Sequence, residues 1–182
     1  MKARNCDICG GPYEKKRMGQ KTCGQFECAV ELERQKELKK RRAENRKRKT
    51  QFLQAQVSEW HKHSNPWSTA YWFHRWIRLV RDKNDPCISC DKSDVIQWHA
   101  GHYRPAGQGS TRYHEDNVHK QCSQCNLQNS GRIGEYRIRL VKKIGLDRVE
   151  ALENNHEIKR WTIEELTAIR DHYKRLCKQE GV

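Results

Sequence analysis

The chain of 182 residues contains no run of 18 or more apolar residues, and no apolar segment follows its basic N-terminus. The first absence argues against a membrane-spanning helix, and the second against a secretory signal peptide. Apolar residues are also scarce overall, since 33% of the chain is charged and the mean hydropathy is −1.13. We therefore expect a soluble, cytoplasmic protein with no membrane partner, whose small core is supplemented by bound metal ions.

Acidic residues are few relative to basic ones. Asp and Glu number 23 against 37 Lys and Arg, which gives a formal net charge of +14 at pH 7. Such an excess favours a polyanionic partner, because each phosphate that a Lys or Arg neutralises releases counterions. Nucleic acid is the expected partner.

Disulfide bonds are not the expected use of the nine cysteines. Eight of them form four close pairs, which is typical of zinc sites in a reducing cytoplasm, and only Cys177 is left over, as a buried thiol. A small N-terminal zinc module, residues 1–30, is predicted from Cys6, Cys9, Cys23 and Cys28. A second structural zinc site is predicted from Cys87, Cys90, Cys122 and Cys125. Whether the first module also contacts nucleic acid stays open.

A basic helical arm is predicted over residues 31–56. Residues 29–56 contain no Gly or Pro and are rich in Glu, Lys, Arg, Gln and Ala, which favours a helix. Its large apolar side chains are too few for a continuous buried stripe, so it is either a solvated helix or linker, or an arm that follows DNA. The candidate DNA-binding residues are Lys39, Lys40, Arg41, Arg42, Arg46, Lys47, Arg48 and Lys49.

Aromatic residues gather after the arm, at the start of a predicted domain over residues 57–182. Trp72, Trp76 and Val80 recur at four-residue steps and form one face of a helix, which we expect to pack on the second zinc unit. Trp60 or Trp67 could instead stack on an unpaired base. A helix is predicted over 135–144, followed by a shorter segment that ends at about residue 152. A last helix is predicted from a capping box at Thr162 to about residue 179.

The segment between the second set of cysteine pairs holds His99, His102, Asn117 and His119. A β-prone run over residues 95–104 predicts a hairpin that carries His99 and His102, and a helix is expected from Cys122 to about residue 131, with Asn126 near its start. A neutral imidazole suits general base catalysis near pH 7. His119 is more simply a structural hydrogen-bonding residue, and Asn126 could be only a helix cap.

This arrangement resembles the HNH, or ββα-metal, nuclease motif, and the chain is similar to the phage NinG/Rap recombination endonucleases. The similarity lies in four motifs in a fixed order, at residues 85–90, 100–104, 117–122 and 160–165. It implies that His102 is the general base and that Asn126 is a ligand of a catalytic Mg²⁺ or Mn²⁺. It also implies that Asn117 orients the imidazole or binds a phosphate. Arg104, in the second motif, is grouped with the DNA-binding residues.

The sequence departs from the family pattern at the expected acidic metal ligand. Gly101 stands where most HNH hairpins have Asp, and His99 stands where a NinG-like chain is expected to have an acidic residue. His99 is therefore a tentative ligand of the catalytic ion, and imidazole suits Mn²⁺, Ni²⁺ or Zn²⁺ better than Mg²⁺. Glu115 or Asp116 could provide the missing carboxylate.

The expected fold is an α-rich α+β protein, with a small zinc-bound ββα core, packed helices, an N-terminal four-cysteine module and a basic helix. The resemblance implies a structure-specific endonuclease acting on branched DNA such as Holliday junctions and D-loops, in the host cytoplasm if phage-encoded. Paired incision of a two-fold junction would favour a homodimer. The alternatives are a catalytically inactive DNA-binding recombination accessory protein and a zinc-finger regulator, although no motif specifies a recognition helix.

Overall fold

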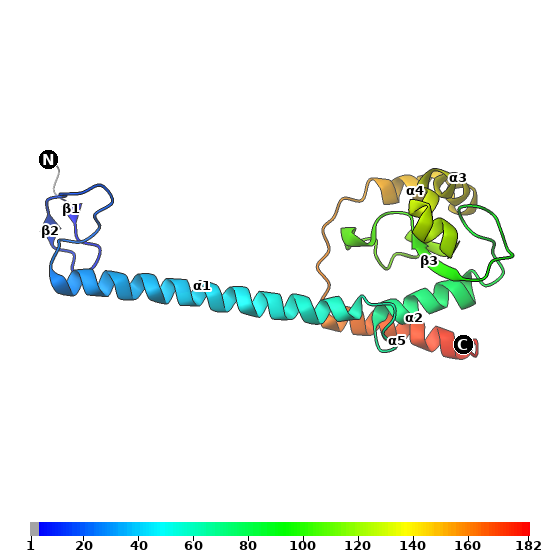
Figure 1. Cartoon of the computed structure of the whole chain (residues 1–182), viewed down its shortest axis with the longest axis horizontal. Coiled ribbons are helices and arrows are strands. Elements are labelled where there is room, and N and C mark those ends of the chain that lie inside the picture. Colours follow the sequence, from blue (N-terminus) through cyan, green and yellow to red (C-terminus); the bar gives the residue numbers. More distant parts are fainter. Residues whose placement is uncertain (1–3) are drawn as a thin grey trace. The chain divides into compact units, whose positions relative to one another are not determined.

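A computed structural model describes residues 4–182 and divides into two compact units, one reaching to Gln54 and the other running from Ala55 to Val182. In the N-terminal unit, β1 (Arg4–Asn5) pairs antiparallel with β2 (Pro12–Tyr13). Helix α1 (Phe26–Trp60) follows and contributes its last turns to the second unit (Figure 1). The helix predicted over 29–56 is confirmed and is slightly longer. No helix within residues 4–182 is long and apolar enough to cross a membrane.

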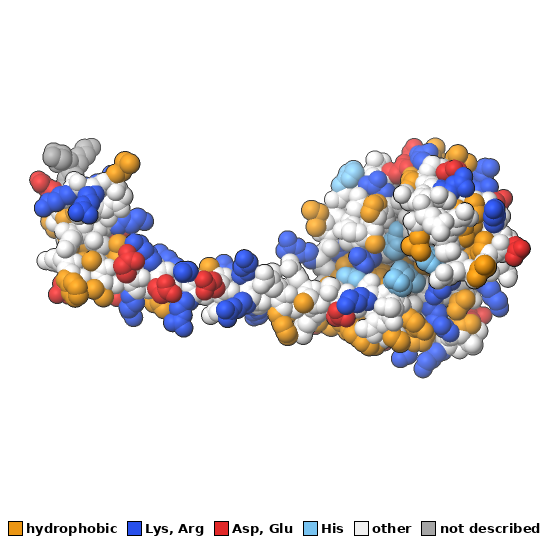
Figure 2. Space-filling view, in the orientation of Figure 1, with side chains coloured by type: hydrophobic (Ala, Val, Ile, Leu, Met, Phe, Trp, Pro, Cys, Tyr) orange, Lys and Arg blue, Asp and Glu red, His pale blue; other side chains and the backbone are white. Residues whose placement is uncertain are grey.

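The basic side chains of α1 are exposed to solvent along its middle section (Figure 2). Glu31 pairs with Arg34 at 2.7 Å and Glu33 with Lys36 at 2.6 Å, and both pairs are spaced by three residues. Exposed pairs of this kind add only a few tenths of a kcal/mol each. The positive charge in the middle of α1 is therefore accessible both to solvent and to an anionic partner.

The C-terminal unit combines helices with one two-stranded sheet. Its elements are α2 (Thr69–Trp76), a π-helical turn (Ile77–Arg81), β3 (Trp98–His102), β4 (Val118–Cys122), α3 (Ile133–Ile144), α4 (Leu146–Glu153) and α5 (Ile163–Gln179). The capping box predicted at Thr162 is present, and Gly145, with φ of 90°, ends α3 as expected. Helices α3 and α4 lie beside each other (Figure 1).

The larger hydrophobic core lies between α2 and α5. The Phe73 and Trp76 rings contact the Tyr173 ring at centroid distances of 4.9 and 4.8 Å, and Cys177 is fully buried beside them, as predicted. The apolar face of α2 was expected to pack on the second zinc unit, but it packs mainly on α5. The prediction was wrong because two amphipathic helices bury more apolar area against each other than a small metal-bound hairpin offers.

Strands β3 and β4 form the antiparallel hairpin that carries His99 and His102, as predicted. Its register pairs Trp98 with Cys122 at one end and His102 with Val118 at the other. The first strand is shorter than the run predicted over 95–104, because residues 95–97 lie outside the ladder. The connection over 103–117 holds short 3-10 turns, so the hairpin is closed by a long loop.

The helix predicted from Cys122 to residue 131 is a single π-helical turn, Gln124–Gln128. The backbone φ angle is then positive at Ser130 (47°), Gly131 (80°) and Arg132 (48°). A right-handed helix cannot pass through three left-handed residues, so the turn stops and α3 starts anew at Ile133. The third element of the ββα pattern is thus much reduced.

Candidate metal centres and active site

The second cysteine cluster holds the open end of the hairpin. The Sγ atoms of Cys87, Cys90, Cys122 and Cys125 all lie within 4.8 Å of one another, and Cys90 Sγ is 3.8 Å from Cys122 Sγ. A tetrahedral zinc ion with Zn–S bonds of about 2.3 Å requires sulfurs about 3.8 Å apart, whereas a disulfide requires about 2.05 Å. The backbone N–H of Cys122 also donates to Cys87 Sγ at 3.3 Å. This donor set fits zinc.

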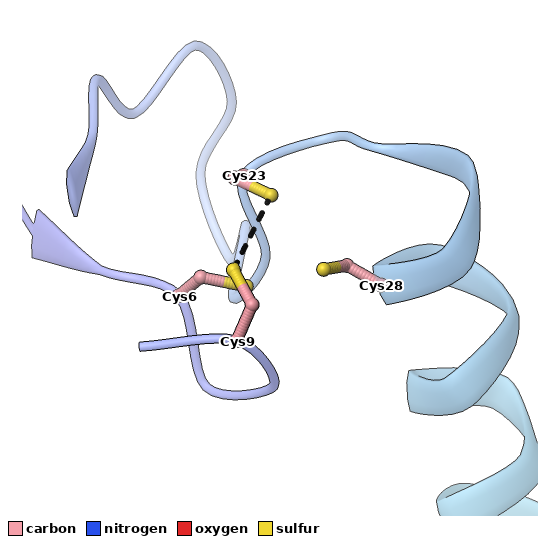
Figure 3. Close-up of side chains that lie close together, drawn as sticks. All are labelled: Cys6, Cys9, Cys23 and Cys28. Atoms are coloured by element: carbon pink, nitrogen blue, oxygen red, sulfur yellow. Dashed lines mark hydrogen bonds between the residues drawn. The ribbon is translucent and has the colours of Figure 1, made fainter. Parts of the chain in front are cut away.

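The N-terminal cluster has the same character. Figure 3 shows Cys6, Cys9 and Cys23 from the loops and Cys28 from the first turns of α1. Their Sγ atoms also lie within 4.8 Å of one another, and Cys9 Sγ is 3.9 Å from Cys23 Sγ. The backbone N–H of Cys9 lowers the pKa of the Cys6 thiol to about 6, which favours the thiolate that zinc binds. Both predicted zinc sites therefore have suitable ligands.

A cavity of about 840 Å³ opens beside β3 in the C-terminal unit. Histidine side chains gather on this unit's visible face (Figure 2). The charged and titratable side chains that line the cavity are His61, His63, His74, His99, His102, Tyr103, Arg78, Arg104 and Arg112. No Asp or Glu of the described part of the chain is among the lining residues. The cavity is therefore suited to an anion.

His102 lies in this cavity with one nitrogen engaged. Its Nε2 donates to the backbone carbonyl of Arg112 at 3.0 Å, and within residues 4–182 no hydrogen-bond partner reaches its Nδ1. Burial lowers the pKa of His102 to about 4, so the imidazole is neutral at pH 7. A neutral imidazole with Nε2 protonated offers Nδ1 as a proton acceptor.

Asn117 does not hold the imidazole or face the cavity. Its side chain is fully buried, Oδ1 accepts from Arg104 N–H at 2.6 Å, and Nδ2 donates to the carbonyls of Arg104 and Thr111 at 3.0 and 2.9 Å. Every hydrogen-bonding group of the amide is thus committed to the backbone of the 103–117 loop. Asn117 therefore fixes this loop at Thr111. The following residue, Arg112, provides the carbonyl that accepts the hydrogen bond from His102 Nε2.

His99 and Asn126 are brought together as predicted. Asn126 Nδ2 and His99 Nδ1 are 3.0 Å apart, and both residues line the cavity. Asn126 lies inside the π-helical turn, whose N-cap is Ser123, so the reading of Asn126 as a helix cap was wrong. Burial, then the charge of Arg78, lowers the pKa of His99. A neutral imidazole beside an amide could hold a divalent ion.

The carboxylates suggested from sequence lie elsewhere. Asp116 forms a bidentate ion pair with Arg148, with Arg148 Nε donating at 2.8 Å, and the Glu115 carboxylate accepts from the Tyr173 hydroxyl at 2.9 Å. Neither residue lines the cavity, so neither replaces the missing acidic ligand. Arg148 on α4 and Tyr173 on α5 instead bind these two carboxylates outside the cavity.

His119 has the structural role that the sequence favoured. It is buried, its Nδ1 is 2.9 Å from Arg81 Nη2 and 3.4 Å from Asp82 Oδ2, and its Nε2 is 3.2 Å from the carbonyl of Asp116. Asp82 in turn accepts from the backbone N–H of Lys120 at 2.9 Å. This network fastens β4 to the segment that follows α2.

A side chain of β4 occupies the space beside Gly101. Gln121 is almost completely buried, and its Nε2 donates to Ser89 Oγ at 2.6 Å and to the carbonyl of Gly131 at 2.7 Å. A Cβ atom at position 101 would collide with the Gln121 side chain. Glycine is therefore required here by close packing across the strand pair.

Several cavity residues were not found from the sequence. His74 on α2 lies 5.5 Å from His102 and 6.1 Å from His63 between ring centroids. Burial, then the neighbouring His102, holds the pKa of His74 well below its usual value. His74 and Arg78 are four residues apart, which places both on one helix face and was the available signal. Of the predicted DNA-binding residues, Arg104 lines the cavity, and the other eight lie on α1.

Comparison with known proteins identifies a family model that matches nearly the whole chain and relatives that match part of it. A family model described as "Bacteriophage Lambda NinG protein" matches residues 1–181. Protein ninG of Escherichia phage lambda is 41% identical over 116 residues, which cover 60% of this chain and 57% of that protein. Protein ninG of Salmonella phage P22 is 40% identical over 116 residues, with the same coverage. These alignments thus span less than two thirds of the relatives' length. No solved structure matches the chain.

Proposed function

Since the chain belongs to the NinG family of bacteriophage proteins, we propose that it is a metal-dependent DNA endonuclease of the HNH type. Its substrates would be branched recombination intermediates, such as Holliday junctions and D-loops, in the cytoplasm of the infected cell. The observation that carries the proposal is the state of His102 in a cationic cavity. Its imidazole is neutral, its Nε2 is fixed, and its Nδ1 has no hydrogen-bond partner among residues 4–182. The branched substrate rests on the family resemblance.

Phosphodiester hydrolysis needs an activated water and compensation of the negative charge on phosphorus. His102 Nδ1 would take the proton from the attacking water, and its Nε2–H remains anchored to the Arg112 carbonyl. The guanidinium groups of Arg78 and Arg112 would neutralise the bound phosphate, since the lining holds no competing carboxylate among the described residues. Asn117 keeps the loop that carries Arg112 in place.

His99 and Asn126 are the residues that would hold a catalytic divalent ion. Such an ion would stabilise charge on the phosphate and on the leaving oxygen. An imidazole and an amide without a carboxylate suit Mn²⁺ better than Mg²⁺. A zinc ion bound by the second cysteine cluster would hold the end of the hairpin where Trp98 pairs with Cys122. It would thereby keep the strand that carries His99 and His102 rigid.

The test is cleavage of a labelled four-way junction by the zinc-loaded full chain with Mn²⁺ or Mg²⁺. We expect His102→Ala to lose cleavage by a factor of at least about 100 while it still binds the junction, because general base catalysis typically contributes this much. His172→Ala is the matched control, since His172 is an exposed histidine on α5 outside the cavity. If wild type and His102→Ala bind equally and neither cuts with any divalent ion, the enzyme proposal fails.

The second candidate is a DNA-binding recombination accessory protein without catalysis. The observation in its favour is that no carboxylate of the described residues lines the cavity, although HNH nucleases use one. The two candidates separate in the same experiment, because the accessory protein would bind the junction without cutting it.

A further inference from the structure

His61 lies just after the end of α1 and reaches the cavity from outside the ββα motif. Its Nδ1 is 2.6 Å from the hydroxyl oxygen of Tyr113. Tyr113 is buried, and its ring is packed edge-on against Phe73 and Trp161 at centroid distances of 5.5 Å each. The position of this hydroxyl is therefore fixed by the core.

The contact with Tyr113 determines which nitrogen of His61 carries a hydrogen. Burial raises the pKa of Tyr113 above its usual value, so the hydroxyl keeps its proton. Two acceptors lie within its reach, and we assign the proton to His61 Nδ1 at 2.6 Å because the Trp60 carbonyl is farther away, at 3.5 Å. Burial, then the charge of Arg112, lowers the pKa of His61 to about 4, so the imidazole is neutral at pH 7. A neutral imidazole that accepts at Nδ1 has its hydrogen on Nε2.

Two of the neutral imidazoles in the cavity thus have opposite polarity. His102 has its Nε2–H engaged and offers an acceptor, whereas His61 has its Nδ1 engaged and offers an N–H donor. The cavity's guanidinium groups are held in place by backbone carbonyls, with Arg78 Nη1 donating to Trp98 at 3.2 Å and Arg112 Nε to Ala106 at 3.0 Å. These groups and the His61 donor suit the oxygens of a phosphate.

We propose that His61 binds a non-bridging oxygen of a DNA phosphate through Nε2–H, and that Tyr113 is the positioning residue that selects this tautomer. The inference rests on the proposed function for the identity of the phosphate. It adds to that function a substrate-binding residue from the end of α1, outside the segment that resembles the nuclease motif.

The direct test is NMR of the zinc-loaded full chain with ¹⁵N-labelled histidine, with dimethyl phosphate as a minimal phosphodiester and inorganic phosphate as a second probe. At pH 7 we expect His61 to be the Nε2–H tautomer, and its Nε2 signal to shift with both probes. In Tyr113→Phe we expect a mixture of tautomers. A Nδ1–H tautomer or an imidazolium in the wild type would overturn the proposal. So would the absence of a shift with dimethyl phosphate, even if inorganic phosphate binds.

Kinetics of junction cleavage provide the second readout. His61→Ala should lower kcat/KM by about 10- to 100-fold, the usual value of one hydrogen bond to a charged group. His61→Gln should recover part of this loss, because its terminal amide can place an N–H near the position of Nε2. Thermal unfolding checks that both variants are folded, and His172→Ala is the control. Equal rates for His61→Ala and wild type would overturn the proposal.

The two proposals can fail separately. If the wild type cuts no junction but dimethyl phosphate still shifts His61, the nuclease assignment fails and the phosphate site stands. If the wild type cuts and His61 neither shifts nor affects cleavage, the phosphate site fails and the nuclease assignment stands.

Discussion

Replacing Asn117 by alanine should destabilise the C-terminal unit strongly, although the resemblance to a nuclease motif suggests a role in binding or orienting. The substitution removes three hydrogen bonds, of 2.6, 3.0 and 2.9 Å, between a fully buried amide and the loop backbone. It leaves the N–H and carbonyl of Arg104 and the carbonyl of Thr111 without these partners. Each unsatisfied buried group costs about 1–3 kcal/mol.

Relaxation of the loop and entry of water recover part of this loss, so we expect a destabilisation of about 3 kcal/mol. For a protein of this length, each kcal/mol shifts the Tm by roughly 2–4 °C, so Asn117→Ala should lower the Tm by about 6–12 °C. The assay is thermal unfolding of the zinc-loaded full chain, followed by circular dichroism. Cleavage should fall too, because the Arg112 carbonyl that orients His102 follows Thr111 directly.

Asn126→Ala is the matched control, because this asparagine lines the cavity and its side chain contacts His99. Its Tm should stay within about 2 °C of the wild type, as for most substitutions outside the core. The reasoning is refuted if Asn117→Ala also unfolds within 2 °C of the wild type. Such a result would mean that the buried amide does not hold the loop.

Three further predictions concern metal, salt and pH. Cys122→Ser should reduce bound zinc from two ions per chain to one and lower the Tm, and retention of two ions by elemental analysis would contradict the second site. Deleting residues 1–50 should weaken DNA binding and flatten the plot of log affinity against log salt, whereas an unchanged slope would exclude the arm from binding. His61 and His102 have folded-state pKa values lowered to about 4, so the unfolded chain binds more protons between pH 6.5 and 4. Stability should therefore be complete above pH 6.5 and fall as the pH drops toward 4, and a Tm that is equal at pH 7 and pH 5 would contradict this burial.

Features set by local spacing were predictable from the sequence. The four-cysteine sets follow from close cysteine pairs, of which three are Cys-x2-Cys and one, Cys23 with Cys28, is Cys-x4-Cys. Helix α5 follows from the capping box at Thr162 and its apolar spacing. The proximity of His99 and Asn126 agrees with their prediction as tentative ligands of one ion, which rested on the order of the motif. Each of these depends on residues close in the chain or on a recognisable pattern.

Features set by long-range packing were not predictable. His74 enters the cavity from α2, and His61 from the end of α1, whose last turn packs against the core between α2 and α5. No local pattern specifies either of these contacts. Glu115 and Asp116 were plausible ligands by position, but partners on α5 and α4 take them. The left-handed residues around Gly131 likewise break a helix that composition alone favours.

The tight packing of Gln121 against Gly101 constrains how this protein could change its metal chemistry. An aspartate introduced at position 101 would displace a side chain that joins Ser89 of the cysteine knuckle to Gly131. An acidic ligand at position 101 and a glutamine at position 121 exclude each other. Placing an aspartate at position 101 therefore requires a second change, at position 121.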